Sequence, residues 1–175
     1  MRRLALGMSA LIASAVTATP AHADEIFGGL YIHDVDTAFT IAGVEDGMDV
    51  QLGWRGEPMT KLQLQQYLYV AANTSGGTHY AAFGFSRKFG DKVFIRPGVG
   101  IAVHTGSTKD FQDESNDRLE LGSLVLFAPE LNIGTHINDR MTIEASWVHM
   151  SHGTLFGGQN PGMDNFGLRL SVQLP

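Results

Sequence analysis

The chain has 175 residues, a formal net charge of −6 at pH 7 and no cysteine. The absence of cysteine excludes a disulfide scaffold, thiol catalysis and a cysteine-ligated metal. Its 18 acidic residues outnumber the 12 basic ones and no basic cluster occurs, which argues against nucleic acid as a partner. A chain of this length has room for one domain and one core.

Residues 1–23 have the organisation of a secretory signal peptide. Two arginines follow the initiator Met, an apolar run extends from Leu4 to Val16, and Ala21-His22-Ala23 supplies the small residues of a cleavage site. The apolar run is too short for a comfortable transmembrane span. We expect cleavage to leave an exported domain, residues 24–175, whose formal net charge changes from −6 to −8 because the two arginines are lost.

Two-residue alternation of apolar and polar residues recurs throughout the exported domain. This period predicts β-strands, because successive side chains of a strand point to opposite faces. Pro97 predicts an irregularity in its strand, since proline cannot donate to the ladder. In chain order the predicted strands are 26–33, 48–55, 62–72, 78–87, 93–104, 118–136, 141–151 and 164–173.

The connections between these strands alternate in length. Long polar segments follow the first, fifth and seventh strands, whereas the second, fourth and sixth are followed by short turns. An up-and-down outer-membrane barrel has short turns at one end, longer loops at the other, and an even number of strands. We therefore predict an all-β fold, an eight-stranded antiparallel up-and-down transmembrane β-barrel with its longer loops outside the cell.

The two faces of the predicted strands differ in polarity. In a soluble barrel the apolar face points inward, whereas a membrane barrel reverses this arrangement. Export and the glycines on the polar face favour a barrel in the bacterial outer membrane, in contact with outer-membrane lipids. A soluble periplasmic barrel that binds a lipid inside is the alternative. One face is aliphatic, and the other carries Asp49, Arg55, Arg96, Glu120, Glu144 and Arg169.

Three polar residues interrupt the apolar face of the last predicted hairpin. His149 and Ser151 share that face because they are two residues apart, and Asp164 continues it on the neighbouring strand. An imidazole, a hydroxyl and a carboxylate are the components of an acyl-transfer triad. Asn160, Gly153 and the backbone amides of the intervening loop are candidate donors to the oxyanion. In the alternative interpretation these three residues have no catalytic role and mark the edge of the apolar outer band.

The C-terminal segment resembles a known family of enzymes. The run His149-Met150-Ser151-His152-Gly153, followed by Asn160-Pro161-Gly162-Met163-Asp164, is similar to the C-terminal signature of the PagL-type lipid A 3-O-deacylases. Segments 96–100 and 122–127 support a resemblance that covers essentially the whole exported domain. It implies an outer-membrane barrel that hydrolyses the ester-linked acyl chain at position 3 of lipid A, with lipopolysaccharide as the partner that carries the substrate.

The resemblance also implies roles for individual residues. Ser151 is then the nucleophile, His149 the base and Asp164 the acidic member, and Asn160 contributes to the oxyanion site. Two positions depart from the family pattern: His152 stands where asparagine is common, and Asp164 where some members have glutamate. Because aspartate is one methylene shorter, it needs closer strand pairing or a small backbone adjustment. No cofactor is implied, and the histidine spacing predicts no metal site.

A second functional class stays open at this point. It is a non-catalytic small outer-membrane β-barrel with a structural or adhesion role, which would not need a triad on its apolar face. The preferred acyl-chain length and the oligomeric state, including a homodimer, are not determined by the sequence.

Overall fold

The structure is a computed structural model that describes residues 24–40, 44–59, 61–110, 118–155 and 160–175. The predicted signal peptide, residues 1–23, lies outside the described residues, so its removal stays a prediction. Within the described residues ten strands form one antiparallel sheet. The strands are β1 (Glu25–Ile32), β2 (Met48–Arg55), β3 (Gln65–Asn73), β4 (Tyr80–Ser86), β5 (Phe89–Gly90), β6 (Val93–His104), β7 (Val125–Phe127), β8 (Glu130–Asn138), β9 (Met141–Met150) and β10 (Met163–Gln173).

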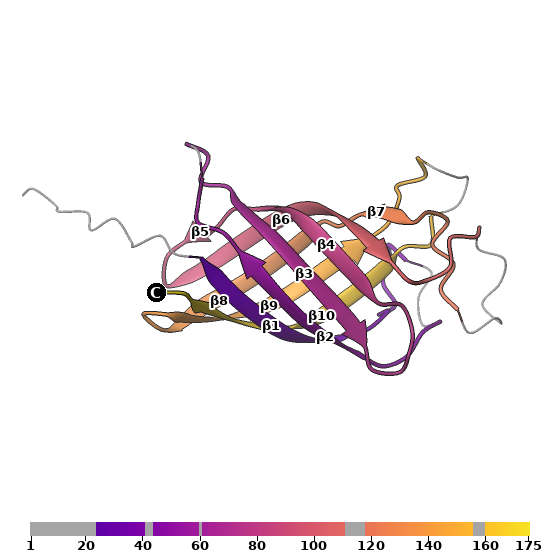
Figure 1. The fold of residues 1–175 in the computed structure, drawn as a ribbon, viewed down its shortest axis with the longest axis horizontal. Coiled ribbons are helices and arrows are strands. Elements are labelled where there is room, and N and C mark those ends of the chain that lie inside the picture. Colours follow the sequence, from indigo (N-terminus) through magenta and orange to yellow (C-terminus); the bar gives the residue numbers. More distant parts are fainter. Residues whose placement is uncertain (1–23, 41–43, 60, 111–117, 156–159) are drawn as a thin grey trace, which may run out of the picture.

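The sheet closes on itself into a barrel (Figure 1). β1 pairs with both β2 and β10, and β4 pairs with both β3 and β6. Among the described strands, these pairings close the ring and leave it without a free edge. β4 and β5 pair successively with β6 and share one position in the wall, and β7 and β8 share another. The described strands therefore occupy eight positions, and the predicted eight-stranded antiparallel barrel is confirmed.

The largest difference from the prediction lies in residues 118–136. We expected one long strand, but regular strand structure begins only with β7. A break at Pro129, which has no amide to donate, then separates β7 from β8. Leu119 and Leu121 alternate with a polar residue, yet all three are buried near the barrel mouth instead of lining a strand. At Pro97, β6 is continuous, and the interruption lies in the neighbouring position of the wall, between β4 and β5.

The barrel is apolar outside and polar inside. Outward residues such as Leu30, Leu52 and Leu168 are 55%, 60% and 59% exposed, whereas Arg96 and Glu144 are fully buried in the interior. This distribution is the reverse of a soluble barrel and is typical of barrels in membranes.

Among the residues that the structure describes, no helix is long and apolar enough to cross a membrane.

The buried arginines and glutamates of the interior form a network of ion pairs. Arg55 Nη1 lies 2.7 Å from Glu25 Oε2, and Arg169 Nη2 lies 3.2 Å from Glu130 Oε2. A third pair joins Arg96 Nε to Glu144 Oε1 at 3.2 Å. Removing one member of a buried pair leaves the other charge buried without its partner, which typically costs about 3–5 kcal/mol. An eight-stranded barrel is just wide enough for side chains to fill, and here these pairs take up much of the interior.

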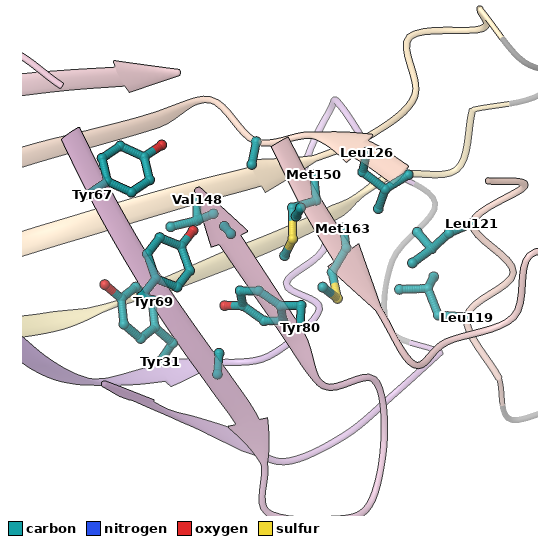
Figure 2. Packing of buried hydrophobic residues seen from close by; sticks show 14 of the residues in the cluster. Tyr31, Tyr67, Tyr69, Tyr80, Leu119, Leu121, Leu126, Val148, Met150 and Met163 are labelled. Atoms are coloured by element: carbon teal, nitrogen blue, oxygen red, sulfur yellow. The ribbon is translucent and has the colours of Figure 1, made fainter. Parts of the chain in front are cut away.

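Toward the end that carries the longer connections, here called the loop end, the interior becomes apolar (Figure 2). The rings of Tyr67 and Tyr69 are stacked with their centroids 5.8 Å apart, and Tyr80 meets Tyr69 edge-on at 6.1 Å. Met150 and Met163 are partners in the ladder between β9 and β10, and both belong to this cluster. The packing fixes the ends of β9 and β10 from the inside.

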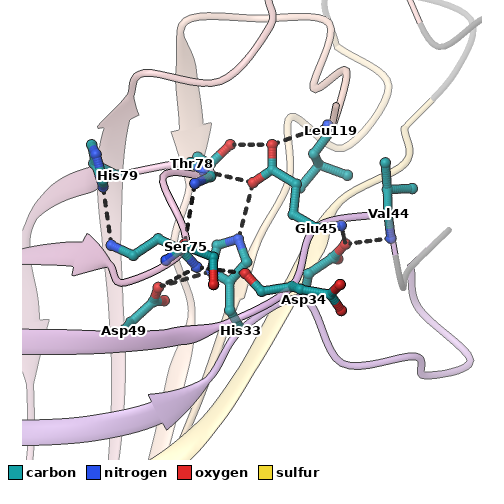
Figure 3. Close-up of polar contacts among 12 residues, drawn as sticks. His33, Asp34, Val44, Glu45, Asp49, Ser75, Thr78, His79 and Leu119 are labelled. Carbon is teal, nitrogen blue, oxygen red and sulfur yellow. Dashed lines mark hydrogen bonds and ion pairs between the residues drawn. The ribbon is translucent and has the colours of Figure 1, made fainter. Parts of the chain in front are cut away.

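Glu45 ties the connections at the loop end together (Figure 3). Its carboxylate accepts hydrogen bonds from His33 Nε2 at 3.1 Å, from the Thr78 hydroxyl at 3.2 Å and from the Leu119 amide at 3.2 Å. Thr78 lies between β3 and β4 and Leu119 between β6 and β7, so one carboxylate joins three connections. His33 Nδ1 lies 2.9 Å from Asp49 Oδ1. We call His33, Glu45, Asp49 and Thr78 the Glu45 network.

The contacts of this network determine its charges. Burial by itself would lower the pKa of His33, but hydrogen bonds to Asp49 and Glu45 outweigh it and raise that pKa from 6.5 to about 9. Burial would raise the pKa of Glu45, but His33 and the amides of Thr78 and Leu119 lower it from 4.5 to about 2. At neutral pH His33 is therefore a cation held between two carboxylates.

We predict that unfolding of the barrel depends on pH through this network. Protonated His33 contributes fully below pH 6.5, and its contribution is lost as the pH rises through about 9. Ionised Glu45 contributes above pH 4.5, and its contribution is lost as the pH falls through about 2. The unfolding temperature in detergent, followed by heat-modifiability, should therefore fall more between about pH 7 and pH 10 for the parent than for His33→Gln. Equal falls in the two proteins would contradict this account.

Candidate active site

His149 and Asp164 lie opposite each other on β9 and β10. They are Cα partners in the antiparallel register, one step from the pair Met150 and Met163. Because neighbouring side chains of a strand alternate, Met150 points into the barrel and His149 points out of it. The interior packing therefore sits directly behind the two polar residues and holds their backbones in place.

The sequence-predicted residues Asp164, His149 and Ser151 form one hydrogen-bonded row. His149 Nδ1 lies 2.9 Å from Asp164 Oδ1, and His149 Nε2 lies 3.0 Å from Ser151 Oγ. An ionised carboxylate only accepts hydrogen bonds, so Nδ1 carries the imidazole proton. In the neutral imidazole Nε2 is then the unprotonated nitrogen, and it accepts the hydroxyl hydrogen of Ser151. The row can move a proton from the hydroxyl to the imidazole.

Ser151 directly follows β9 and is held against β7. The Ser151 amide donates to the Phe127 carbonyl at 3.0 Å, and the Phe127 amide donates back to the Ser151 carbonyl at 2.8 Å. The next contact along β9 is made by the His149 amide, which donates to the Pro129 carbonyl at 3.0 Å. These bonds fix the serine on its backbone, and Ser151 as a whole is only 8% exposed.

Asp164 is buried even though it continues the outward face of β10. Oδ1 accepts a second hydrogen bond, from Trp147 Nε1 at 2.8 Å, and Oδ2 accepts one from the Thr37 hydroxyl. Sequence reasoning identified neither donor. Alternation could have found Trp147, which shares its face with His149 two residues later. Thr37 lies in the connection between β1 and β2, and its local sequence carries no signal for a contact so far along the chain.

Asn160 and Gly153 lie in the connection between β9 and β10. Asn160 Oδ1 accepts hydrogen bonds from the amides of His152 and Gly153, at 3.1 and 3.2 Å. The Gly153 amide is therefore already engaged, while the NH2 group of Asn160 is the donating end of the same carboxamide. Gly153 has a φ of 60°, a conformation that favours glycine. His152 is buried and packs against Gly122, where an added Cβ would lie 2.8 Å from its Nε2.

An apolar hollow of about 500 Å³ lies on the outer surface beside Asp164. Phe39 closes one side of it, with its ring centroid 6.3 Å from that of Trp147 and 6.4 Å from that of His149. The rings of Trp147 and Phe166, which are stacked with their centroids 6.4 Å apart, also line it. The floor is aliphatic and includes Leu131, Ile133 and Ala145.

Comparison with known proteins identifies a family and a fold. Residues 41–173 match the family model described as lipid A 3-O-deacylase (PagL). The crystal structure of the outer membrane enzyme PagL is similar, with 21% identity, a TM-score of 0.58, and coverage of 86% of this chain and 99% of that one. A search of curated proteins found no match.

Two other bacterial barrels have a similar fold. The N-terminal β-barrel domain of Pseudomonas aeruginosa OprF is 10% identical, with coverage of 86% of this chain and 98% of that one and a TM-score of 0.56. Neisserial surface protein A is 9% identical, with coverage of 86% and 97% and a TM-score of 0.56. At such identities these structures establish the fold alone.

The family match extends over most of the chain and includes His149, Ser151, Asn160 and Asp164. It agrees with the resemblance carried by the C-terminal motif and with the apolar outer face of the barrel. The chain belongs to the lipid A 3-O-deacylase (PagL) family and is an ester hydrolase of the bacterial outer membrane.

Proposed function

We propose that the protein removes the 3-O-acyl chain of lipid A by nucleophilic catalysis, with Ser151 as nucleophile, His149 as general base and Asp164 as the group that orients His149. The observation that carries the proposal is the row of hydrogen bonds from Asp164 through His149 to Ser151. Polar side chains beside an apolar outer face cost free energy in a membrane. A non-catalytic barrel would have no use for them.

The first half of the reaction acylates the enzyme. His149 Nε2 takes the hydroxyl proton of Ser151 as Oγ attacks the carbonyl carbon of the ester. The tetrahedral intermediate collapses when the bond from this carbon to the sugar oxygen breaks, and His149 gives the proton to that oxygen. The sugar leaves with a free 3-hydroxyl group, and the acyl chain stays on Ser151.

The second half releases the fatty acid. A water molecule loses a proton to His149 Nε2 and attacks the carbonyl carbon of the acyl-serine. The bond from this carbon to Ser151 Oγ then breaks, and His149 returns the proton to Oγ. Asp164 accepts from Nδ1 throughout, so it keeps the imidazole in the useful tautomer and stabilises the imidazolium that forms in each half.

We assign the oxyanion to the side chain of Asn160. Its Oδ1 is already occupied by the amides of His152 and Gly153, so the NH2 group is the end that is free to donate to developing negative charge. This refines the expectation from sequence, which gave Gly153 the same role. The Gly153 amide is instead bonded to Asn160 Oδ1 and helps to hold that side chain.

The substrate reaches this site from the membrane. We place the loop end outside the cell and the row of polar residues at the outer rim of the barrel, where lipid A in the outer leaflet arrives by lateral diffusion. The apolar hollow beside Asp164 offers Phe39, Trp147 and Phe166 to an acyl chain. Polar groups near the interface cost less than at the centre of the bilayer, which suits a row of this kind.

Ser151→Ala tests the nucleophile. The hydroxyl contacts His149 and has no packing role that alanine cannot fill, so we expect a folded, heat-modifiable barrel. Deacylation should fall by several orders of magnitude. Mass spectrometry of lipid A from cells that express the parent or the variant measures the loss of one hydroxyacyl chain.

Ser123→Ala is a matched control, since Ser123 lies in the connection between β6 and β7 and its hydroxyl is hydrogen-bonded to the backbone of Val125, away from His149. This variant should remain active. Full deacylation by a folded Ser151→Ala protein would refute the mechanism.

Asn160→Asp tests the oxyanion donor. The new carboxylate keeps an acceptor for the amides of His152 and Gly153, so the connection should keep its shape. The NH2 donor is lost and a negative charge faces the oxyanion, so kcat should fall by at least about 100-fold. Steady-state deacylation in detergent checks this, with the unfolding temperature as a control. A variant with the activity of the parent would exclude Asn160 as the donor.

A further inference from the structure

We propose that Thr37 is a positioning residue for the deacylation reaction. Its hydroxyl, supplied by the connection between β1 and β2, holds the Asp164 carboxylate in the orientation in which that group faces His149. The inference rests on the proposed triad and extends it to a residue 127 positions away from Asp164 in the sequence.

The hydrogen of the Thr37 hydroxyl has one well-defined acceptor. The Phe39 amide donates to Thr37 Oγ1 at 3.1 Å, so the oxygen is already used as an acceptor. The hydroxyl of Thr40 is 3.5 Å away and directs its own hydrogen toward the Val35 carbonyl, at 3.4 Å. An ionised carboxylate accepts and never donates. The Thr37 hydrogen therefore goes to Oδ2 of Asp164.

Both oxygens of Asp164 are engaged, and the donors come from separate parts of the barrel. Oδ1 faces His149 Nδ1 and Trp147 Nε1, both on β9, and Oδ2 faces Thr37. Rotation of the carboxylate away from His149 would break the bond to Thr37 as well. Without the Thr37 hydroxyl, Oδ2 loses its partner and the plane of the carboxylate is less constrained. Aspartate is also short, so its reach toward His149 depends on its orientation.

The segment that carries Thr37 is itself fastened to β10. The Val35 amide donates to the Asp164 carbonyl at 2.7 Å, and the Asp34 amide donates to Asn165 Oδ1 at 2.9 Å. Asp34 has a φ of 49°, a left-handed conformation that is uncommon outside glycine and turns the chain back over β10. Thr37 thus approaches Asp164 from a backbone that is bonded to Asp164 itself.

The far side of the same connection is also held. The Asp34 carboxylate accepts hydrogen bonds from the amides of Val44 and Glu45, at 3.0 and 3.1 Å. Glu45 belongs to the network that joins three connections at the loop end (Figure 3). A residue at each end of the connection is therefore anchored, and these anchors are separate from the hydroxyl of Thr37. Removing that hydroxyl breaks its bonds to Asp164 and to the Phe39 amide, while the anchors at Asp34, Val35 and Glu45 stay in place.

The first test compares Thr37→Val with Thr37→Ser in purified protein acting on lipid A in detergent. Valine keeps the shape of threonine and removes the hydroxyl, whereas serine keeps the hydroxyl. We expect kcat of Thr37→Val to fall by about 10-fold to 100-fold, the range for one hydrogen bond to a charged group, with KM changed by less than about 3-fold. Thr37→Ser should restore kcat to within about 3-fold of the parent.

Two outcomes of this comparison overturn the inference. One is an unchanged kcat in Thr37→Val, which would show that the hydroxyl is not needed. The other is an equal loss in Thr37→Ser, which would show that the methyl group or the packing of the segment is what matters. The unfolding temperature of each variant, read by heat-modifiability, confirms that the compared proteins are folded.

A double-mutant cycle tests whether Thr37 acts through Asp164. In an Asp164→Ala background the partner is absent, so Thr37→Val should lower kcat no further. A fall as large as in the parent background would overturn the inference.

The same set of proteins separates this inference from the proposed triad. If Ser151→Ala and Asp164→Ala keep the activity of the parent, the triad itself is wrong. If both lose activity and Thr37→Val does not, only the role of Thr37 is wrong.

Discussion

The site depends on keeping one carboxylate satisfied at the apolar outer surface of a barrel. A buried charge without partners is too costly to persist, so every acceptor position of Asp164 that faces the protein needs a donor. His149, Trp147 and Thr37 supply them. The row that reaches Ser151 follows from this requirement, because the donor opposite Asp164 is an imidazole whose other nitrogen faces a hydroxyl.

The other charged side chains of the strands lie inside the barrel, which leaves its outer surface apolar. Since the outward face is aliphatic, the charged side chains of the strands must point inward and pair, as Arg169 does with Glu130. Near the loop end the pairs give way to the aromatic and methionine cluster behind β9 and β10. Rigid packing on the inside and a hydrogen-bonded segment on the outside together hold His149 and Asp164, while the open hollow beside them remains accessible.

The features that depend on the two-residue alternation of a strand could be predicted from the sequence. Contacts between residues far apart in the chain could not. Alternation placed Leu168 outside and Arg169 inside, and the two-residue step from His149 to Ser151 brought those side chains together. Alternation also misled around Leu119, because residues packed near the barrel mouth repeat with the period of a strand. The contact between Thr37 and Asp164 could not be predicted, since it depends on how a whole connection folds over β10.

Labelling with a lipophilic fluorophosphonate tests the central claim most directly, because such a reagent reacts with an activated serine. Peptide mass spectrometry of the labelled protein should find one adduct, on Ser151, whose formation follows the loss of lipid A deacylation. The adduct should be absent from His149→Ala, in which no base activates the hydroxyl. Full deacylation by protein that is fully labelled on Ser151, or complete inactivation with Ser151 unmodified, would contradict the account.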